Sequence, residues 1–118
     1  MAYDQNNIFA KILRGEIPCA KVFENDHVLA FNDIAAKAPV HVLIIPKGAY
    51  ISFADFSQNA SEEEIVSLNR AIGEIARAKG IVETGYRVIS NHSEHARQEV
   101  PHYHVHLLGG KDLGGCFN

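Results

Sequence analysis

A single amphipathic helix is the feature that most limits how this 118-residue chain can fold. Its start is marked by Ser61-Glu62-Glu63-Glu64, a capping box in which the serine and the third glutamate satisfy each other's backbone N–H groups. The acidic side chains also suit the positive end of the helix dipole. Apolar residues then recur at three- and four-residue spacing: Ile65, Leu68, Ile72, Ile75 and Ala76. Gly80 is a stop signal, so the helix is predicted to end near Lys79 with one face packed on other elements.

Five short segments with the composition of strands surround this helix: 21–24, 27–32, 41–46, 86–91 and 102–108. The turn-forming pair Asn25-Asp26 predicts a hairpin between the first two segments. A polar loop from His92 to Gln98 joins the last two segments, and it is too short for a crossover helix. These elements predict an α+β fold with a mostly antiparallel five-stranded sheet.

A second, short helix is expected at the start of the chain. Asn7 can cap a helix from Ile8 to Arg14, and Gly15 is a plausible end signal. We therefore expect a single domain over residues 1–118, with its core at about 7–110 and a short tail at 111–118.

Composition narrows the class of protein. With 47% hydrophobic residues, 21% charged residues and a net charge of −3, the chain has neither the charge excess of a disordered segment nor the basic balance of a nucleic-acid binder. The start of the chain does not resemble a secretory signal, and the longest aliphatic run, Val42 to Ile45, is far shorter than the ~20 residues of a membrane span. We expect a cytoplasmic protein with no nucleic-acid or membrane partner. Cys19 and Cys116 are expected to be free thiols.

Five of the seven histidines lie between His92 and His106, and three of them alternate with apolar residues in His102-Tyr103-His104-Val105-His106-Leu107-Leu108. On a strand, this alternation places His102, His104 and His106 on one face. One such histidine would be an ordinary core or surface residue. Three are harder to explain, because each buried ring needs partners for two nitrogens and charged rings would repel one another.

Two chemistries suit this array. Two histidines two residues apart can share a zinc ion, but the Cα atoms of His102 and His106 would be ~13 Å apart, and no Cys pair supplies further ligands. Metal binding therefore ranks second. A neutral imidazole can instead attack phosphorus as a nucleophile. The central His104 is best placed for this role, with its neighbours orienting it, bonding phosphate oxygens or passing a proton.

The chain resembles the histidine triad (HIT) superfamily, whose signature alternates three histidines with apolar residues as in 102–108. Further blocks resemble its histidine triad nucleotide-binding (HINT) branch: 8–18, 30–34, 38–41, 44–47 and 108–110, with Asn91 and Gln98 at matching spacings. The resemblance implies a HIT-like fold, no cofactor, no metal at the site and a homodimer. It also implies hydrolysis of purine nucleoside 5′-phosphoramidates through a covalent nucleotidyl-histidine.

The resemblance also implies roles for individual residues. His104 would attack the α-phosphorus, His102 would orient His104 with His41 behind it, and His106 and Asn91 would contact the phosphate oxygens. Gln98 and Glu99 fall at positions that line the phosphate site, and Asp33 falls where the ribose hydroxyls bind. The positions of the purine pocket correspond to Ile8, Phe9, Ile12, Phe31, Asn32 and Ile34. From the residues alone, Asp33 would be a turn residue, Gln98 a loop amide and most of the apolar group core.

The chain also departs from its relatives. Asn7 and Ala10 stand where some bacterial relatives carry a zinc-binding Cys pair, so no structural zinc is expected there. A protonated Glu99 can donate to a leaving amine, whereas an ionised Glu99 repels the phosphate unless it is paired, and the sequence favours neither. Base preference and leaving group stay open. A nucleotide-binding regulatory module with little turnover, and a dinucleoside polyphosphate hydrolase or nucleotidyl transferase, are the alternative functions.

Overall fold

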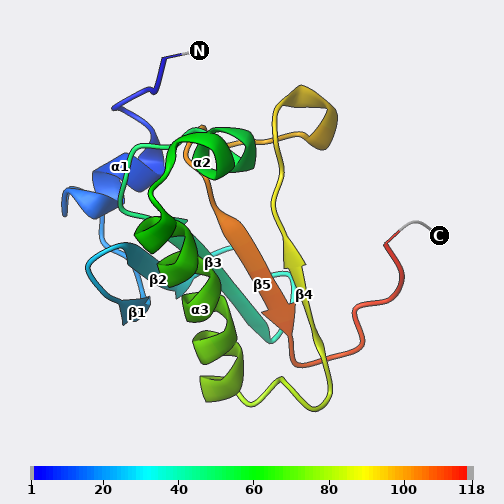
Figure 1. The fold of residues 1–118 in the computed structure, drawn as a ribbon. Helices are drawn as coiled ribbons and strands as arrows, with labels where there is room; N and C mark the ends of the chain where they lie inside the picture. The colour runs from blue at the N-terminus through cyan, green and yellow to red at the C-terminus, as the bar shows by residue number, and fades with distance from the viewer. Residues whose placement is uncertain (1, 117–118) are drawn as a thin grey trace.

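The computed structural model describes residues 2–116, which form a five-stranded sheet with helices on both faces (Figure 1). The strand order is β1-β2-β3-β5-β4, and every neighbouring pair is antiparallel. The strands are β1 (Lys21–Glu24), β2 (Val28–Asn32), β3 (Val40–Pro46), β4 (Tyr86–Ile89) and β5 (Val105–Gly109). The predicted α+β class and antiparallel five-stranded sheet are confirmed. The predicted hairpin is formed by β1 and β2. Its turn is held by the Asn25 side chain, which accepts the backbone N–H groups of His27 and Val28 at 2.9 Å.

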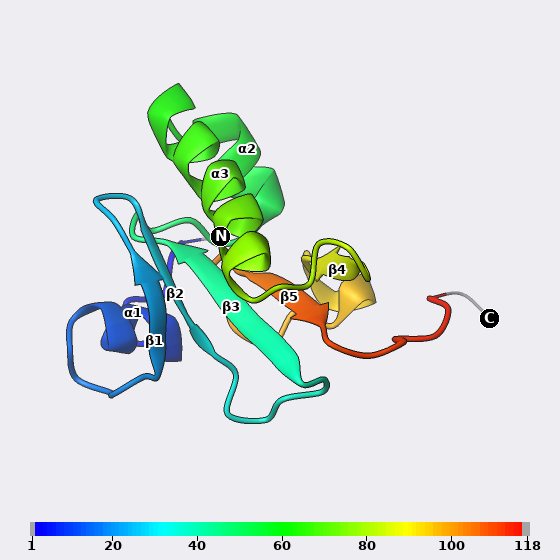
Figure 2. The same cartoon turned by 90° about the horizontal axis from the view of Figure 1, so that it is seen from below.

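Side-chain alternation along β3 divides the interior into two layers. Val42 and Ile44 pack beneath α3 (Glu62–Ala78), whereas Leu43 and Ile45 pack beside Phe9 of α1 (Ile8–Leu13) on the opposite face. Figure 2 shows α3 and α1 on opposite sides of the sheet. Because side chains alternate strictly along a strand, His41 belongs to the α1 face.

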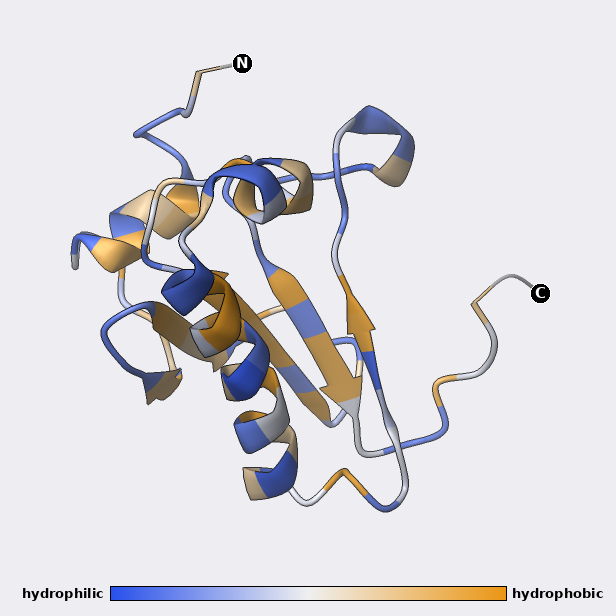
Figure 3. Ribbon diagram, in the orientation of Figure 1, coloured by the Kyte–Doolittle hydropathy of each residue, from blue (hydrophilic) through white to orange (hydrophobic). Residues whose placement is uncertain are grey.

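Helix α3 has the start, end and apolar face that its sequence predicts. The Ser61 side chain accepts the N–H of Glu64, and the Glu64 carboxylate accepts the N–H of Ser61, which completes the capping box. Gly80 adopts φ +70°, which a residue with a side chain disfavours. In Figure 3 the apolar side of α3 faces the sheet and the polar side faces outward. Its buried residues are Leu68, Ala71, Ile75 and Ala76.

Helix α1 is held by Asn7, as its sequence predicts. The Asn7 side chain accepts the N–H of Ala10 at 2.9 Å and donates to the carbonyl oxygen of Asp4 at 2.7 Å. Asn7 therefore caps the helix and also fastens the preceding segment to it.

The short helix α2 (Phe53–Asn59) and the 3₁₀ turn at Glu94–Ala96 were not predicted from the sequence. Helix α2 has Ser52 as its N-cap residue, but it is only seven residues long and buries only Phe56, so it lacks the repeated apolar spacing that marks a longer amphipathic helix. No helix within residues 2–116 combines the length and apolarity needed to cross a bilayer. Both cysteines are free, with Cys19 half-buried and Cys116 exposed.

The last strand is shorter than predicted. A strand over 102–108 was expected, but β5 begins at Val105. Extending the register of β5 would bring Tyr103 opposite Pro46, which has no N–H to donate. The carbonyl groups of the residues before β5 are used differently: that of His102 accepts His104 Nδ1, and that of His104 accepts the Ser90 hydroxyl.

Candidate active site

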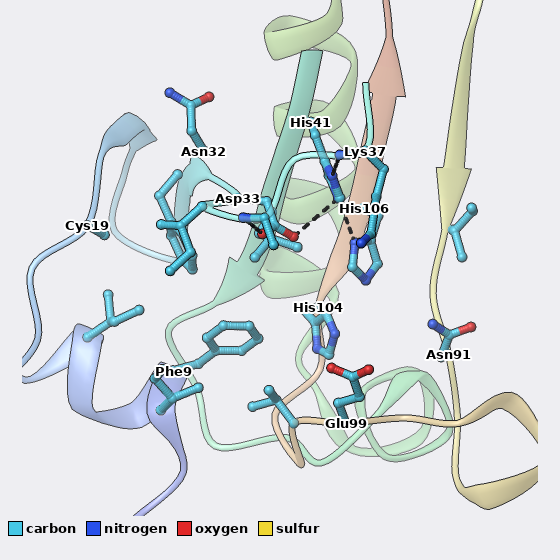
Figure 4. A pocket seen from close by; sticks show the side chains of 18 of the residues that line it. Phe9, Cys19, Asn32, Asp33, Lys37, His41, Asn91, Glu99, His104 and His106 are labelled. Atoms are coloured by element: carbon cyan, nitrogen blue, oxygen red, sulfur yellow. Dashed lines mark hydrogen bonds and ion pairs between the residues drawn. The ribbon is translucent and has the colours of Figure 1, made fainter. Parts of the chain in front are cut away.

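A cavity of about 530 Å³ opens on the α1 face of the sheet (Figure 4). It is bounded by α1, the loop between β2 and β3, and the loop between β4 and β5. Most residues that the sequence assigned to a nucleotide site line it: Ile8, Phe9, Ile12, Phe31, Asn32, Asp33, Ile34, His41, Asn91, Glu99, His104 and His106. His102 and Gln98 do not belong to its lining. The structure therefore gathers the predicted groups from distant parts of the chain into one cavity.

His104 presents one defined nitrogen to the cavity. Its Nδ1 lies 2.7 Å from the main-chain oxygen of His102, and because a carbonyl oxygen only accepts, Nδ1 carries the hydrogen. Burial lowers the pKa of His104, so the ring is neutral at pH 7 and Nε2 keeps its lone pair. The edge-to-face contact with Phe9, at 5.0 Å between ring centres, fixes the ring from the other side. The arrangement leaves Nε2 available as a nucleophile.

His102 lies behind the cavity and is fully buried. Its Nε2 is 2.9 Å from the carbonyl oxygen of Pro46, and its Nδ1 is 2.6 Å from the hydroxyl of Tyr3. Burial lowers the pKa of His102 to about 4, which keeps the ring neutral. His102 thus meets His104 through its backbone carbonyl, not through its imidazole.

His41 pairs with His106, not with His102 as the resemblance implied. The N–H of Lys37 donates to His41 Nδ1 at 3.0 Å, so the hydrogen of the His41 ring is on Nε2, and Nε2 donates to His106 Nδ1 at 2.9 Å. The sheet register explains this pairing. His41 is opposite Leu108 and diagonal to His106, whereas His102 is at the far end of β3 beside Pro46.

The bonds from Lys37 to His41 and from His41 to His106 also decide which nitrogen of His106 carries a hydrogen. Because Nδ1 accepts from His41, the hydrogen of a neutral His106 ring is on Nε2. Burial, followed by the neighbouring His104 and His41, lowers the pKa of His106 to about 4. His106 therefore offers a donor where His104 offers a lone pair, and their ring centres are 5.2 Å apart.

Asp33 is both a turn residue and a cavity residue, so the two readings of its sequence position coexist. Oδ1 accepts the N–H of Ala35 at 2.8 Å, and Oδ2 lies 3.4 Å from His41 Nε2 (Figure 4). Ligand atoms of Asp33, His41 and His106 lie within 4.8 Å of one another, close enough for a metal ion. However, the Lys37 N–H keeps the hydrogen of His41 on Nε2, so that atom is a donor and does not fit a metal.

Glu99 and Asp33 bring negative charge close to His104. Figure 4 shows the Glu99 carboxylate turned toward the His104 ring. Both carboxylates favour protonated His104, but burial outweighs them, and the pKa of His104 is lowered overall. Lys37 and Arg97 also line the cavity, so two basic residues accompany the carboxylates.

Gln98 organises the loop that carries Asn91 and Glu99. Its Nε2 donates to the carbonyl groups of Ile51 and Val100, and its Oε1 accepts the N–H of Ser93. Ser93 and Arg97 have φ values of +63° and +57°, which are strained for residues with side chains. The amide of Gln98 is used within the protein and holds this strained loop, instead of reaching the cavity.

The hydrogen bond between Tyr3 and His102 was not predicted from the sequence. Tyr3 is separated from His102 by 99 positions, and a half-buried tyrosine near the start of a chain has no periodicity that would relate it to the triad. Lys37 acts through its backbone N–H, which every residue except proline carries, so its side chain gives no signal for this role.

The fold and the histidine geometry define a histidine triad protein, and comparisons with known proteins agree. The chain belongs to the HIT domain family, whose sequence model matches residues 14–113. It is 59% identical over 112 residues to an uncharacterized 13.2 kDa HIT-like protein of Azospirillum brasilense, covering 95% of this chain and 92% of that one. It is 44% identical over 110 residues to the purine nucleoside phosphoramidase of Escherichia coli K12, covering 93% of this chain and 92% of the enzyme.

Solved structures extend the agreement. A histidine triad protein from Clostridium difficile has 45% sequence identity and a TM-score of 0.86, covering 98% of this chain and 99% of that one. A HIT family hydrolase from Clostridium thermocellum has 37% identity and a TM-score of 0.85, with the same coverage of each chain. The expected HIT relationship is confirmed, and the chain is similar to hydrolases of this family.

Proposed function

We propose that this protein cleaves the P–N bond of purine nucleoside 5′-phosphoramidates through a covalent nucleotidyl intermediate on His104. The observation that carries this proposal is the bond from His104 Nδ1 to the His102 carbonyl, which leaves Nε2 as a bare lone pair in the cavity. The similarity to the purine nucleoside phosphoramidase of E. coli supports the substrate class.

In the first step, His104 Nε2 attacks the α-phosphorus. The new N–P bond forms as the substrate P–N bond breaks, and the leaving amine takes the electron pair and a proton. A protonated Glu99 or a water molecule in the cavity is the candidate proton source, since Glu99 lines the cavity beside His104. The neutral His106 ring keeps its single N–H, because losing it would leave an imidazolate anion. His106 and the amide of Asn91 also suit the phosphate oxygens as hydrogen-bond donors.

In the second step, water attacks the phosphorus of the nucleotidyl-histidine. Its hydroxyl group joins the phosphate, its proton replaces the one given to the amine, and the N–P bond to His104 breaks with the electron pair returning to Nε2. The product is a nucleoside 5′-monophosphate, and the site returns to its starting state. Neither step uses a metal ion or cofactor.

The remainder of the cavity suits a nucleoside. Phe9, Phe31 and Ile12 supply apolar walls of the kind that hold a flat base, with Ile8, Asn32 and Ile34 completing the purine site. The carboxylate of Asp33 can accept hydrogen bonds from two neighbouring ribose hydroxyls. Apolar walls discriminate weakly between adenine and guanine, so both bases fit this proposal.

We further propose that the protein acts as a homodimer. Strand β4 is an edge of the sheet, and an exposed edge offers unpaired backbone groups to a second copy. Tyr86 and Val88 on this strand are 41% and 46% exposed. Apolar side chains of this size beside an open edge support pairing between copies.

Incubation with adenosine 5′-phosphoramidate tests the proposed activity. Release of AMP is expected, unchanged by a metal chelator, and the acid-labile adenylyl-protein should be trapped on His104 by rapid quenching. His104→Ala should lower turnover by ~10³-fold or more while still binding AMP, because a covalent catalyst is lost but the cavity remains.

Four results would redirect the proposal. Activity lost on chelation would rule out the metal-free mechanism, and activity kept in His104→Ala would remove the nucleophile. Tight AMP binding without turnover of any phosphoramidate or dinucleoside polyphosphate would indicate a regulatory nucleotide-binding module. Faster turnover of a dinucleoside polyphosphate than of the phosphoramidate would indicate the neighbouring activity of the superfamily.

A further inference from the structure

We propose that Tyr3 is a positioning residue for His104: its hydroxyl holds the His102 imidazole, and through it the carbonyl group that orients the nucleophile. This inference rests on the proposed function for its kinetic consequences. Its structural part concerns three groups in series, namely the Tyr3 hydroxyl, the His102 ring and backbone, and His104 Nδ1.

The hydrogen-bond directions in this series follow from the partners. The carbonyl group of Pro46 only accepts, so His102 Nε2 must donate to it and carry the hydrogen. Because the buried ring is neutral, its Nδ1 is an acceptor, and the Tyr3 hydroxyl at 2.6 Å must be the donor. Tyr3 and Pro46 therefore hold the His102 ring at both nitrogens and in one tautomer.

The His102 carbonyl has no place in a strand ladder, because β5 begins only at Val105. Two sets of bonds fix its direction: the Tyr103 N–H in the same peptide group donates to the carbonyl oxygen of Tyr50 at 2.7 Å, and the side-chain bonds of His102 hold residue 102 on the other side. That same carbonyl accepts His104 Nδ1 at 2.7 Å and so decides which nitrogen of His104 faces the cavity. A loosened His102 would let the His104 ring turn or exchange tautomers, and Nε2 would then lose its lone pair for part of the time.

Tyr3 is itself anchored to the rest of the protein. Asp4, the next residue, accepts Asn7 Nδ2 at 2.7 Å with its carbonyl oxygen, and buried Asn7 caps α1 through Ala10. The Tyr3 ring also makes an edge contact with the His102 ring, with centres 5.6 Å apart. The segment before α1 is thereby a fixed part of the site's support, although Tyr3 does not line the cavity.

The variant Tyr3→Phe removes the hydroxyl and keeps the ring. Because the cavity lining is unchanged, we expect kcat for adenosine 5′-phosphoramidate to fall about 10-fold while KM stays within about two-fold. The acid limb of the kcat/KM profile should also move to lower pH, since a weaker bond to the His102 carbonyl removes a contribution that raises the pKa of His104.

Tyr50→Phe is the matched control. The Tyr50 hydroxyl donates to the Glu64 carboxylate at 2.8 Å, so this variant also deletes a bonded tyrosine hydroxyl, while it keeps the Tyr50 carbonyl that accepts the Tyr103 N–H beside the triad. Nitrogen-15 spectra of the histidine rings provide a second measurement that does not depend on turnover. In Tyr3→Phe alone, the His102 Nδ1 resonance should move toward the position of an unbonded nitrogen, and His104 should show mixed tautomers.

The outcomes separate this inference from the proposed function. If the wild type is active and Tyr3→Phe matches it in kcat and in the His104 tautomer, the positioning role is overturned and the activity stands. If both variants lose activity in parallel with stability, the role of Tyr3 is only structural and the inference is again overturned. If the wild type is inactive, the proposed function fails, and the ring spectra alone decide: mixed His104 tautomers in Tyr3→Phe support the inference, and unchanged spectra overturn it.

Discussion

His41 Nε2 lies 2.9 Å from His106 Nδ1, and this contact decides that Nε2 is the nitrogen of His106 that can donate to a substrate. The Lys37 N–H donates to His41 Nδ1 and so keeps the ring hydrogen of His41 on Nε2, which makes His41 the donor in this bond. His41 therefore acts on the cavity through another histidine, although it also lines the cavity wall.

Replacing His41 tests this relay. His41→Ala should lower kcat about 10- to 100-fold, by analogy with the loss of the hydrogen-bond partner that orients a metal-ligating histidine. His41→Gln is the matched variant, because its amide N–H can replace Nε2 as the donor, and it should retain more activity. Steady-state kinetics on the phosphoramidate would measure both, and equal losses in the two variants would argue against the relay.

Glu99 provides a test of charge beside the nucleophile. In Glu99→Gln, one negative charge that favours protonated His104 is lost, so the pKa of His104 should fall further and the acid limb of kcat/KM should move to lower pH. KM for the anionic substrate should decrease as well, because a repulsive charge is removed. A higher KM with a much lower kcat would instead indicate that Glu99 donates the proton to the leaving group.

The stability of the protein should decrease below neutral pH because of its buried histidines. The pKa of His102 is about 4 in the folded protein and about 6.5 in an unfolded chain, so between these values only the unfolded chain binds the proton. The free energy of unfolding should thus fall as pH is lowered from about 6.5 to about 4, by about 3 kcal/mol from His102. His106 acts in the same direction.

Urea unfolding at pH 7.5 and pH 4.5 measures this loss. His102→Gln removes the titrating group, so the difference between the two pH values should be smaller in the variant than in the wild type. An equal difference in both proteins would assign the pH dependence to other groups.

The Gln98 amide is predicted to act on the loop, not on the phosphate. Gln98→Ala removes bonds to Ser93, Ile51 and Val100, so the backbone amide of Ser93 should exchange hydrogen faster. Gln58→Ala, an exposed amide on α2, is the control. Unchanged exchange at Ser93, together with a raised KM, would support a direct phosphate contact.

The capping box of α3 should contribute to stability without affecting catalysis. Ser61→Ala removes the acceptor for the Glu64 N–H and should cost about 1 kcal/mol in the free energy of unfolding. Because α3 packs on the face opposite the cavity, kcat should not change. The exposed Ser57→Ala is a matched control in urea unfolding, and a large loss of activity in Ser61→Ala would contradict the separation of the two faces.

The elements that could be predicted from the sequence are those with local signals. Asn7, Ser61 and Gly80 mark helix boundaries through bonds or angles within a few residues, and the structure contains all three. Alternation within 102–108 likewise predicted a shared face for His104 and His106 without any long-range information, and both line the cavity. The family blocks supplied His41 and the residues proposed to bind the nucleoside, most of which periodicity alone would have assigned to the core.

The missed features depend on long-range contacts. The Tyr3 hydroxyl reaches His102 across 99 positions, and the pairing of His41 with His106 depends on the register between β3 and β5. The late start of β5 has a similar cause, because it reflects a proline on the neighbouring strand. Such relationships arise from the folded backbone, so no pattern within a single segment contains them.

Side chains on one face of β3 and β5 pack in the apolar layer under α3, and those on the other face line the cavity, so only the correct pairing of the strands gives an active protein. A slip of one residue in the pairing of β5 would turn His106 toward α3 and send Val105 and Leu107 into the cavity. That molecule would bury an imidazole in the apolar layer and lose part of its core at the same time. Misfolded copies with this error would therefore be too unstable to accumulate as inactive competitors for the substrate.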